Sequence, residues 1–290
     1  MISVLIVTHN NAGDIPACLD SLPWPDIPLE VLVIDNRSRD DTGERLRQWK
    51  NAHPSRNLRL FLNRENRGFA AGINQGLANA TGDPLLILGP DTALFPDTLP
   101  VLSRKLSAEN RVGAAAPRIL DWRGNLLPSC RRFPRMHDIL FELTGLPRLF
   151  PGCFTPKWKM PEFDHRTERE VDQPEATCLL VRRGVIDSAG MMDERFPIFF
   201  NDVDWCLRIR RAGWKILFAP GARIRHRKGT SVRQDPMHLI WKSHQGCFRY
   251  FRKHRSGRFS LFVLSGLGIL LIWTGIVRSV LVRTGIFRDV

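Results

Sequence analysis

The sequence lacks several signatures that would assign it to common classes of protein. Its six cysteines are scattered, with no CxxC pair and no histidine at zinc-finger spacing, which excludes a zinc finger and makes a disulfide framework a poor fit. No GxGxxG motif follows the first apolar run, which argues against a dinucleotide-dependent dehydrogenase. The N-terminus has no basic region before a long apolar core, so we expect no signal peptide and a reducing, cytoplasmic setting.

Acidic residues are almost missing from one part of the chain. Of 290 residues, 43 are Lys or Arg and 29 are Asp or Glu, giving a net charge of +14. Residues 205–258 hold 15 bases and a single acid, Asp235, so the rest of the chain is balanced. This concentration predicts a local anionic partner. Nucleic acid is disfavoured because no nucleic-acid-binding motif accompanies the charge.

The C-terminal region contains the longest uncharged run. Phe259–Val277 has 19 residues without a charge, about 28 Å as a helix, which is just enough to cross a bilayer. Basic residues flank it on both sides, so residues 249–290 are predicted to associate with an anionic membrane surface, on the cytoplasmic face of the inner membrane. The pattern leaves open whether this segment spans the bilayer or lies in its interface, and a buried core helix is the alternative.

The first hundred residues alternate between short apolar runs and amphipathic stretches. This alternation predicts a doubly wound, mostly parallel α/β sheet flanked by helices. Residues 145–174 show no period and are predicted to be a long loop. The expected strands are 2–7, 30–34, 58–62, 84–88, 178–181 and 215–219, and the expected helices are 14–22, 42–49, 70–79, 96–108, one from 185 and 204–212.

Three carboxylates stand where a parallel sheet binds its ligand. Asp35 follows the run VLVI, Asp91 follows PLLIL after a Gly-Pro step, and Asp202 precedes a helix. Ligands bind at the carboxyl ends of such strands, where acids accept bonds from ribose, hold Mg²⁺ or Mn²⁺, or deprotonate a hydroxyl. Taken singly, each could be a turn residue or a helix-capping acid.

Six segments of the chain, taken in order, carry a specific resemblance. The chain resembles a family 2 glycosyltransferase of the GT-A fold, close to the bacterial rhamnosyltransferase-like branch, over roughly residues 2–231. The segments are VLIVTHNN (4–11), VLVIDNRSRDDT (31–42), NRGFAAGINQGLANATGD (66–83), LLILGPDTALFPDTL (85–99), ATCLLVRRGVIDSAGMMDERFPIFFNDVDWCLRIRRAGW (176–214) and APGARIRHRKGTS (219–231).

The resemblance implies a nucleotide-sugar site on one side of the cleft. Thr8 and Asn10 are implied to lie against the base, and Asp35 to bind the base or ribose. Gly68 and Asn74 are implied to shape the loop and helix on the nucleotide side.

The resemblance also implies a metal and a base. Asp91 is implied to coordinate a divalent cation, Mg²⁺ or Mn²⁺, and His226 to complete that metal site, although a surface histidine in the run RIRHRKG is the alternative. Asp202 corresponds to the catalytic base, with Asn201 and Asp204 on the acceptor side.

Two positions depart from the family pattern. The family usually has Asn where this chain has Gly89, and usually Glu where it has Asn201. The first change removes an amide near the diphosphate, and the second removes a carboxylate from the acceptor side. Arg131 and Arg132 could meet a phosphate or could form a solvated turn.

The resemblance implies an inverting hexosyltransferase with two regions. Residues 1–231 would form the catalytic domain, and residues 232–290 a basic linker with an apolar, membrane-associating C-terminal segment. The enzyme would move rhamnose or a similar hexose to a glycan or lipid-linked acceptor in cell-surface polysaccharide synthesis. Alternatives are a sugar-phosphate nucleotidyltransferase, disfavoured because residues 8–16 lack a glycine-rich triphosphate loop, and a non-catalytic membrane-attached binding protein.

Overall fold

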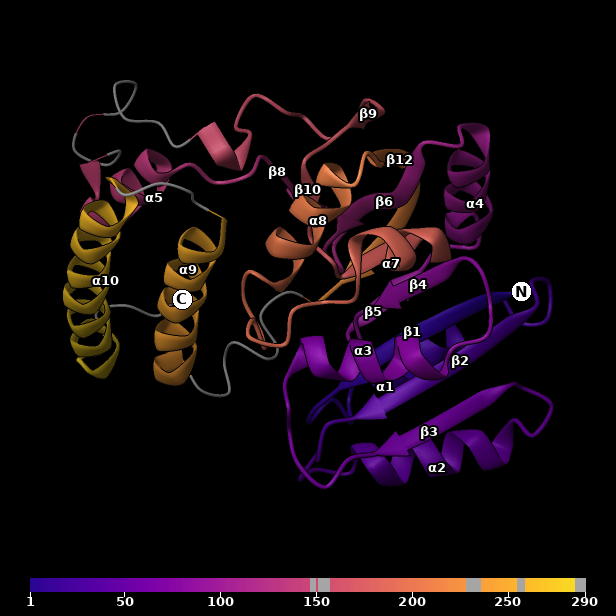
Figure 1. Ribbon diagram of the computed structural model, residues 1–290. Coiled ribbons are helices and arrows are strands. Elements are labelled where there is room, and N and C mark those ends of the chain that lie inside the picture. Colours follow the sequence, from indigo (N-terminus) through magenta and orange to yellow (C-terminus); the bar gives the residue numbers. More distant parts are fainter. Residues whose placement is uncertain (147–149, 151–156, 228–235, 255–258, 285–290) are drawn as a thin grey trace. The chain divides into compact units, whose positions relative to one another are not determined.

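The computed structural model describes residues 1–146, 150, 157–227, 236–254 and 259–284 (Figure 1). The chain divides into two compact units. The first comprises Met1–Arg131, Glu162–Pro197 and the chain from Asn201 to its last described residue before the gap, Arg227; the second comprises residues 132–161, 198–200 and 229–290. Several residues of the predicted segments, namely 228–231, Arg255, Arg258 and Arg288, lie outside the described residues.

A ten-stranded, mostly parallel sheet forms the centre of the first unit. Its main path has the strand order β3-β2-β1-β4-β11-β6-β12-β5, and the short strands β7 and β9 pair with β6 and β12 beside this path. Strands β3, β2, β1 and β4 are parallel, and so are β6 and β12, whereas β11 runs antiparallel to its two neighbours. The strands are β1 Ile2–Thr8, β2 Leu29–Asp35, β3 Leu58–Leu62, β4 Leu85–Leu88, β5 Thr92–Leu94, β6 Val112–Leu120, β7 Leu126–Leu127, β9 Arg169–Glu170, β11 Cys178–Val181 and β12 Lys215–His226. A separate two-stranded ladder pairs β8 Cys130–Arg131 with β10 Gln173–Pro174.

Helices cover both faces of this sheet, which is why its central strands are buried along their whole length. Every residue of β1, β2, β4 and β11 is buried. The helices of this unit are α1 Ile15–Asp20, α2 Thr42–Ala52, α3 Phe69–Asn79, α4 Thr98–Ala108, α7 Arg183–Ala189 and α8 Asn201–Arg211. Helices α1, α2 and α4 pack on the face that holds Val4, Val33 and Leu86. Gly76 of α3 lies against Leu5 and Ile34 of the opposite face. The predicted fold class, a doubly wound and mostly parallel α/β sheet, is confirmed.

Several elements differ from the sequence prediction, each for a local reason. Strand β6 was not predicted, because its sequence VGAAAPRIL is rich in alanine and contains a proline. Strand β12 was predicted to end at Ala219 but continues to His226 through an irregularity between Ala219 and Arg223 that absorbs Pro220 and Gly221. The predicted loop 145–174 contains β9, β10 and the 3₁₀ turn Lys157–Lys159, while residues 147–149 and 151–156 lie outside the described residues.

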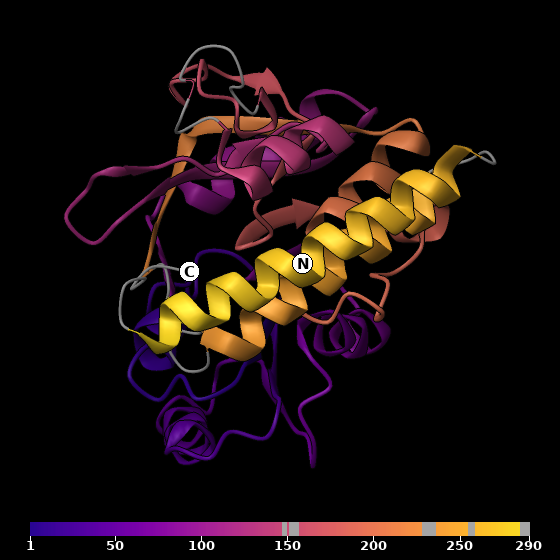
Figure 2. The same cartoon turned by 90° about the vertical axis from the view of Figure 1, so that its left-hand side faces the viewer.

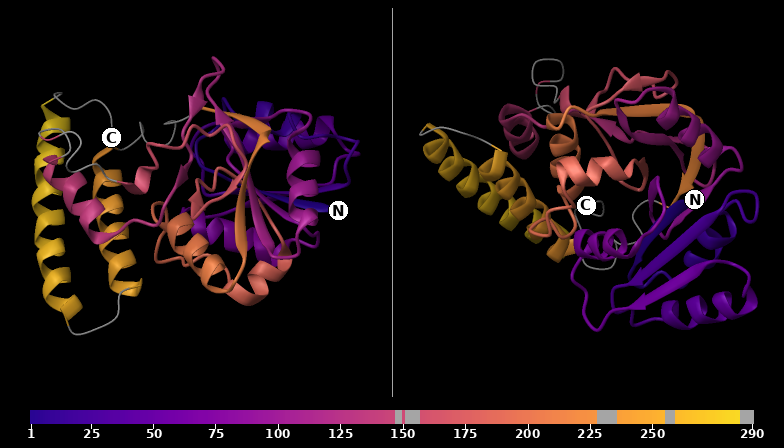
Figure 3. Two further views of the ribbon diagram at one scale, coloured as in Figure 1. Left: turned by 90° about the horizontal axis from the view of Figure 1, so that it is seen from above. Right: turned by 45° about the vertical axis from the view of Figure 1, so that its right-hand side comes forward.

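The second unit is helical. It contains α5 Met136–Thr144, α9 Pro236–His254 and α10 Phe259–Arg283. Figures 2 and 3 show α9 and α10 as long neighbouring helices. The segment predicted as a basic linker therefore contains a helix of 19 residues. Val263–Arg283 is long and apolar enough to cross a membrane by length and composition alone, with a mean hydropathy of 1.8.

Candidate active site

The end of β2 presents Asp35 beside the loop that follows β1. Thr8 and Asp35 are partners in the parallel β1–β2 ladder, and both are nearly fully buried. The Ser38 hydroxyl donates a short hydrogen bond to Asp35 Oδ1, and the Ser38 amide donates to the same oxygen at 3.2 Å. The structure thus places the two predicted nucleotide residues side by side at the carboxyl edge of the sheet.

Asn10 joins the two loops at this edge. Its φ of 56° is left-handed, a conformation that asparagine tolerates better than most residues. Its amide donates to Ser38 Oγ at 2.9 Å, and its Oδ1 accepts from the Arg39 amide at 2.8 Å. Asn10 therefore shapes the loop around Asp35, and its contact with a base remains a prediction.

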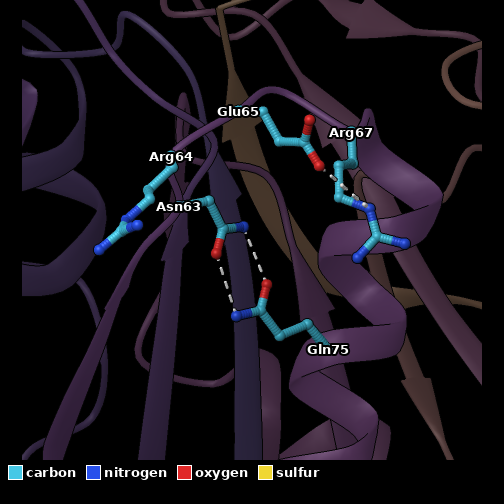
Figure 4. A pocket seen from close by; sticks show the side chains of 5 residues that line it. All are labelled: Asn63, Arg64, Glu65, Arg67 and Gln75. Atoms are coloured by element: carbon cyan, nitrogen blue, oxygen red, sulfur yellow. Dashed lines mark hydrogen bonds and ion pairs between the residues drawn. The ribbon is translucent and has the colours of Figure 1, made fainter.

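A polar pocket lies next to Asp35, beyond the end of β3 (Figure 4). It is lined by Asn63, Arg64, Glu65, Arg67 and Gln75. The side-chain amides of Asn63 and Gln75 exchange hydrogen bonds of 2.9 and 3.1 Å. The backbone N–H of Asn63 donates to the backbone carbonyl of Asp35 at 2.9 Å. Such a pocket offers amide donors and acceptors beside the end of β2.

Gly68 and Asn74 connect α3 to the segment that precedes Asp202. Gly68 has φ +89°, and a Cβ there would lie 2.6 Å from Pro197 Cβ, so only glycine fits. Asn74 Nδ2 donates to the Met192 carbonyl at 2.9 Å, and its Oδ1 accepts from the Met192 amide at 3.0 Å. The close approach of Gly68 and the bonds of Asn74 both join α3 to that segment. The part of these residues in nucleotide binding stays a prediction.

Asp91 and His226 meet on the predicted metal side. His226 Nε2 lies 3.4 Å from Asp91 Oδ2, with exposed fractions of 12% and 11% for the two side chains. The β5–β12 ladder brings them together, since His226 pairs with Thr92 and the Arg227 amide donates to the Asp91 carbonyl at 3.0 Å. His226 Nδ1 is buried without a hydrogen-bond partner among the described residues.

Asp14 and Arg227 stand beside this pair. Arg227 Nη1 lies 3.1 Å from Asp14 Oδ1. Burial raises the pKa of Asp14, the positive charge of Arg227 opposes that shift, and the nearby Asp91 adds to it. The cluster therefore alternates acidic and basic groups around Asp91.

The residues present suit a divalent cation only in part. Within the described ranges, no group of three His, Cys, Asp or Glu side chains is placed to hold a metal. Two donors, Asp91 and His226, do lie together, and His226 has a buried nitrogen without a partner. Magnesium usually takes one or two protein carboxylates and completes its shell with phosphate oxygens and water. The pair fits a cation that a diphosphate helps to hold.

The geometry explains why glycine at position 89 is compatible with the fold. A Cβ at Gly89 would lie 3.2 Å from Asp91 Oδ1 and 3.3 to 3.4 Å from the methyl groups of Thr92 and Thr177. A larger side chain would press on the carboxylate that faces His226. Glycine leaves Asp91 in place.

Asp202 lies in the first turn of α8, in a partly desolvated position. The side chain is partly exposed, and its Oδ1 accepts a bond of 2.9 Å from the Val203 amide. Burial raises the pKa of Asp202; the Glu175 carboxylate adds to this shift, and Arg131 opposes it. Arg131 Nη2 and Glu175 Oε1 are 3.3 Å apart across the β8–β10 ladder. A carboxylate with a raised pKa is a better proton acceptor than an ordinary aspartate.

The two neighbours of Asp202 on the predicted acceptor side are more deeply buried. Asn201 is 3% exposed and Asp204 is 0% exposed. Asp204 Oδ2 accepts a bond of 2.9 Å from Arg208 Nε, and Arg208 Nη2 donates to the Met191 carbonyl at 2.8 Å. Arg208, held by Asp204, thus ties α8 to the loop before it, and direct contact of Asn201 or Asp204 with an acceptor remains a prediction.

A buried histidine supports the β8–β10 ladder. His165 is 1% exposed, and its Nε2 accepts from the amides of Ser129 and Cys130 at 3.2 and 3.1 Å. Its Nδ1 lies 2.9 Å from the Phe163 carbonyl, so the neutral ring donates there and accepts at Nε2. Burial lowers the pKa of His165.

Acid should weaken this support. Because the folded-state pKa is below the ordinary value of about 6.5, the stability that His165 contributes is complete above that pH and is lost as the pH falls towards the folded-state pKa. We expect His165→Phe to destabilise the protein by about 2 kcal/mol at pH 7.5 and to show a smaller loss of Tm between pH 7.5 and 5.5 than the parent. His137→Phe, at a side chain that is 56% exposed, is the control; an equal loss of Tm in parent and His165→Phe would contradict this.

Comparison with known proteins decides the family. The family described as Glycosyl transferase family 2 matches residues 3–154, which is more than half of the chain. This chain belongs to that family. The region matched includes Thr8, Asp35 and Asp91.

One curated relative of this family 2 glycosyltransferase is named for its action on a lipid-linked sugar. An N-acetylglucosaminyl-diphospho-decaprenol L-rhamnosyltransferase of Mycobacterium tuberculosis is 28% identical over 274 residues, covering 89% of this chain and 86% of the relative. The predicted rhamnosyltransferase-like resemblance is confirmed.

Solved structures confirm the GT-A fold of this glycosyltransferase. The mannosyltransferase PcManGT of Pyrobaculum calidifontis, in complex with GDP-Man and Mn²⁺, has a TM-score of 0.57 at 20% identity and covers 100% of this chain and 76% of its own. TarS 1–349 of S. aureus in complex with UDP-GlcNAc has a TM-score of 0.57 at 16% identity and covers 92% of this chain and 71% of its own. At these identities the likeness shows the fold alone.

Sequence reasoning missed several residues that surround the candidate site. Ser38 and Asn63 bond to Asp35, and Asp14 and Glu175 flank Asp91 and Asp202. Glu175 had no signal, because it precedes a strand and follows a stretch without period. Asp14 could have been noticed from its position before a helix with proline at its start.

Proposed function

We propose that this glycosyltransferase is a metal-dependent, inverting hexosyltransferase. It would move rhamnose or a similar hexose from a nucleoside-diphosphate sugar to a hydroxyl of a glycan or lipid-linked acceptor in cell-surface polysaccharide synthesis. The observation that carries the proposal is the pairing of Asp91 with His226 at the sheet edge that also presents Asp35. The name of the mycobacterial relative supports the sugar and the lipid-linked acceptor.

The donor side follows from the strand ends. Asp35, already fixed by Ser38, would accept hydrogen bonds from the ribose or base, next to the amide-lined pocket at Asn63. Asp91 and His226 would hold Mg²⁺ or Mn²⁺ with the diphosphate. A cation there would stabilise the negative charge that grows on the departing nucleoside diphosphate. The Mn²⁺ in the PcManGT complex supports this choice of cofactor.

The acceptor side follows from Asp202. Its carboxylate would accept the proton of the acceptor hydroxyl as that oxygen attacks the anomeric carbon, so that one displacement inverts the configuration. Burial and the Glu175 carboxylate keep the pKa of Asp202 above the ordinary value, and the positive charge of Arg131 limits that rise. Asn201 and Asp204 would set the position of α8 behind it.

Membrane association completes the proposal. We place the enzyme at the cytoplasmic face of the inner membrane, where residues 249–290 meet an anionic surface. The apolar α10 and the decaprenol in the relative's name support this placement.

A donor screen tests the proposal. Purified protein with Mn²⁺ or Mg²⁺ and a panel of UDP-, dTDP- and GDP-sugars should show one donor that raises Tm by several degrees at 100 times its Kd. Release of nucleoside diphosphate should increase when a lipid-linked acceptor is added. Formation of a nucleotide-sugar from a nucleoside triphosphate and a sugar phosphate would instead show a nucleotidyltransferase. Donor binding without any turnover would show a binding protein.

A further inference from the structure

Helix α10 has an exposed apolar stripe on the face opposite to α9. Five large side chains spaced three or four residues apart are 49–71% exposed, namely Ile269, Ile272, Trp273, Ile276 and Val280. On a helix this spacing places them on one face. An uncovered stripe of this kind marks an interaction surface.

Helix α9 packs tightly on the other face of α10. His244 Nε2 lies 3.2 Å from Thr274 Oγ1. A Cβ at Gly275 would lie 3.0 Å from the Trp241 ring, and one at Gly268 would lie 3.4 Å from the Phe248 ring. Gly268 and Gly275 are seven residues apart, as are Trp241 and Phe248, and the glycine that comes later in the chain contacts the ring that comes earlier. The two helices therefore form a close antiparallel pair, the α9–α10 hairpin.

If α10 crossed a bilayer, the charged side chains of α9 would lie deep inside that bilayer. The contacts of Trp241 and Phe248 place Lys242 and Arg249 within about 7 Å of the level of Leu271, at the middle of α10. A charged side chain at the centre of a bilayer is costly. Packing against α9 therefore opposes a spanning α10, although its length and hydropathy allow one.

The hairpin also matches an anionic surface in charge. Helices α9 and α10 contain no Asp or Glu and six Lys or Arg, which are Lys242, Arg249, Arg252, Lys253, Arg278 and Arg283. Cations near an apolar helix face attract anionic lipid head groups. Apolar insertion and charge attraction thus favour the same partner.

We propose that α10 lies in the plane of the membrane, with the stripe Ile269–Val280 in the acyl boundary of an anionic leaflet and α9 stacked behind it on the aqueous side. This inference rests on the proposed placement of the enzyme at a membrane. It adds the orientation of the helix and the residues that touch lipid.

Vesicle binding tests the lipid-facing stripe. The full chain should sediment with phosphatidylcholine vesicles that contain phosphatidylglycerol, and Ile272→Gln/Ile276→Gln should lower the bound fraction at least tenfold. Leu126→Gln/Met191→Gln, at side chains that are 37% and 42% exposed in the first unit, is the matched control and should bind like the parent. Unchanged binding of the α10 variant would overturn the proposal. The proposal would also be overturned if the parent did not bind vesicles and instead formed a dimer that the α10 variant loses.

Cysteine labelling distinguishes an in-plane helix from a spanning one. The five cysteines that the structure describes are buried, so Cys153→Ser provides a background for Arg252→Cys before α10 and Thr284→Cys after it. With protein bound to sealed vesicles, an impermeant maleimide added outside should label both positions to the same extent. Protection of position 284 alone would show that α10 crosses the bilayer. Release of nucleoside diphosphate in the same samples reports the proposed function separately, so the two can fail independently.

Discussion

Replacing Asp202 with asparagine is expected to lower kcat for sugar transfer by about 10³-fold, the usual contribution of a positioned base. Donor affinity should change by less than about threefold, because the proposed role of Asp202 is on the acceptor side, where the charges that act on its pKa are those of Glu175 and Arg131. Asparagine keeps an oxygen for the Val203 amide, so the start of α8 should persist. Initial rates and donor titration by calorimetry measure the two effects.

The pH profile gives an independent check of the same residue. The base must be ionised, and its pKa is raised, so kcat should fall with decreasing pH at a higher pH than for an ordinary aspartate near 3.9. Glu175→Gln removes a neighbouring negative charge and should move this acid limb to lower pH. Asp187→Asn, at an exposed position on α7, is the control. Asp202→Asn protein with more than a tenth of the parent rate would show that the base lies elsewhere.

Replacing Asp91 with asparagine is expected to weaken metal-dependent donor binding by at least about 100-fold, in line with the several kcal/mol that a bound cation contributes. The reason is the Asp91–His226 contact, since asparagine would lose the charge that balances a cation there. The donor affinity measured with Mn²⁺ should differ widely from the donor affinity measured with EDTA in the parent, and the two should differ little in the variant. Asp26→Asn, at an exposed loop position, should behave like the parent.

Two results would contradict the metal assignment. One is a parent enzyme whose turnover is the same in EDTA and in Mn²⁺. The other is an Asp91→Asn enzyme that keeps the full response to Mn²⁺, which would place the cation away from this carboxylate. His226→Gln separates the partners, because it should weaken the metal response while leaving the Asp91 carboxylate in place.

Much of the sheet could be predicted because its strands are buried on both faces. Runs such as VLIV and EVLVI have no other stable place than a covered parallel sheet. Strand β6 escaped prediction because alanine and proline give no strand signal, and its place between β11 and β12 is set by tertiary pairing. Helix α9 was not predicted, because its basic residues suggested a linker. Its apolar face can be recognised only from its packing against α10.

The site could be predicted as a list of acids but not as a set of contacts. Strand ends suggested Asp35 and Asp91 as site residues, and the resemblance to the family suggested Asp202. The resemblance to the family could not show that Asn74 bonds to the loop at Met192 or that the Glu175 charge acts on Asp202. Both contacts depend on segments that are far apart in sequence. Side chains that organise others leave no local pattern.

The basic stretch has a different meaning once its ion pairs are known. Five of the seven Lys and Arg between residues 205 and 227 pair with carboxylates, as Arg208–Asp204, Arg210–Glu170, Lys215–Glu109, Arg223–Asp97 and Arg227–Asp14. Beyond a Debye length, about 8 Å at physiological ionic strength, such pairs act as dipoles. The long-range pull of an anionic surface therefore acts mainly on the α9–α10 hairpin. If the enzyme meets an anionic membrane as proposed, the hairpin should therefore be the part that the surface captures first.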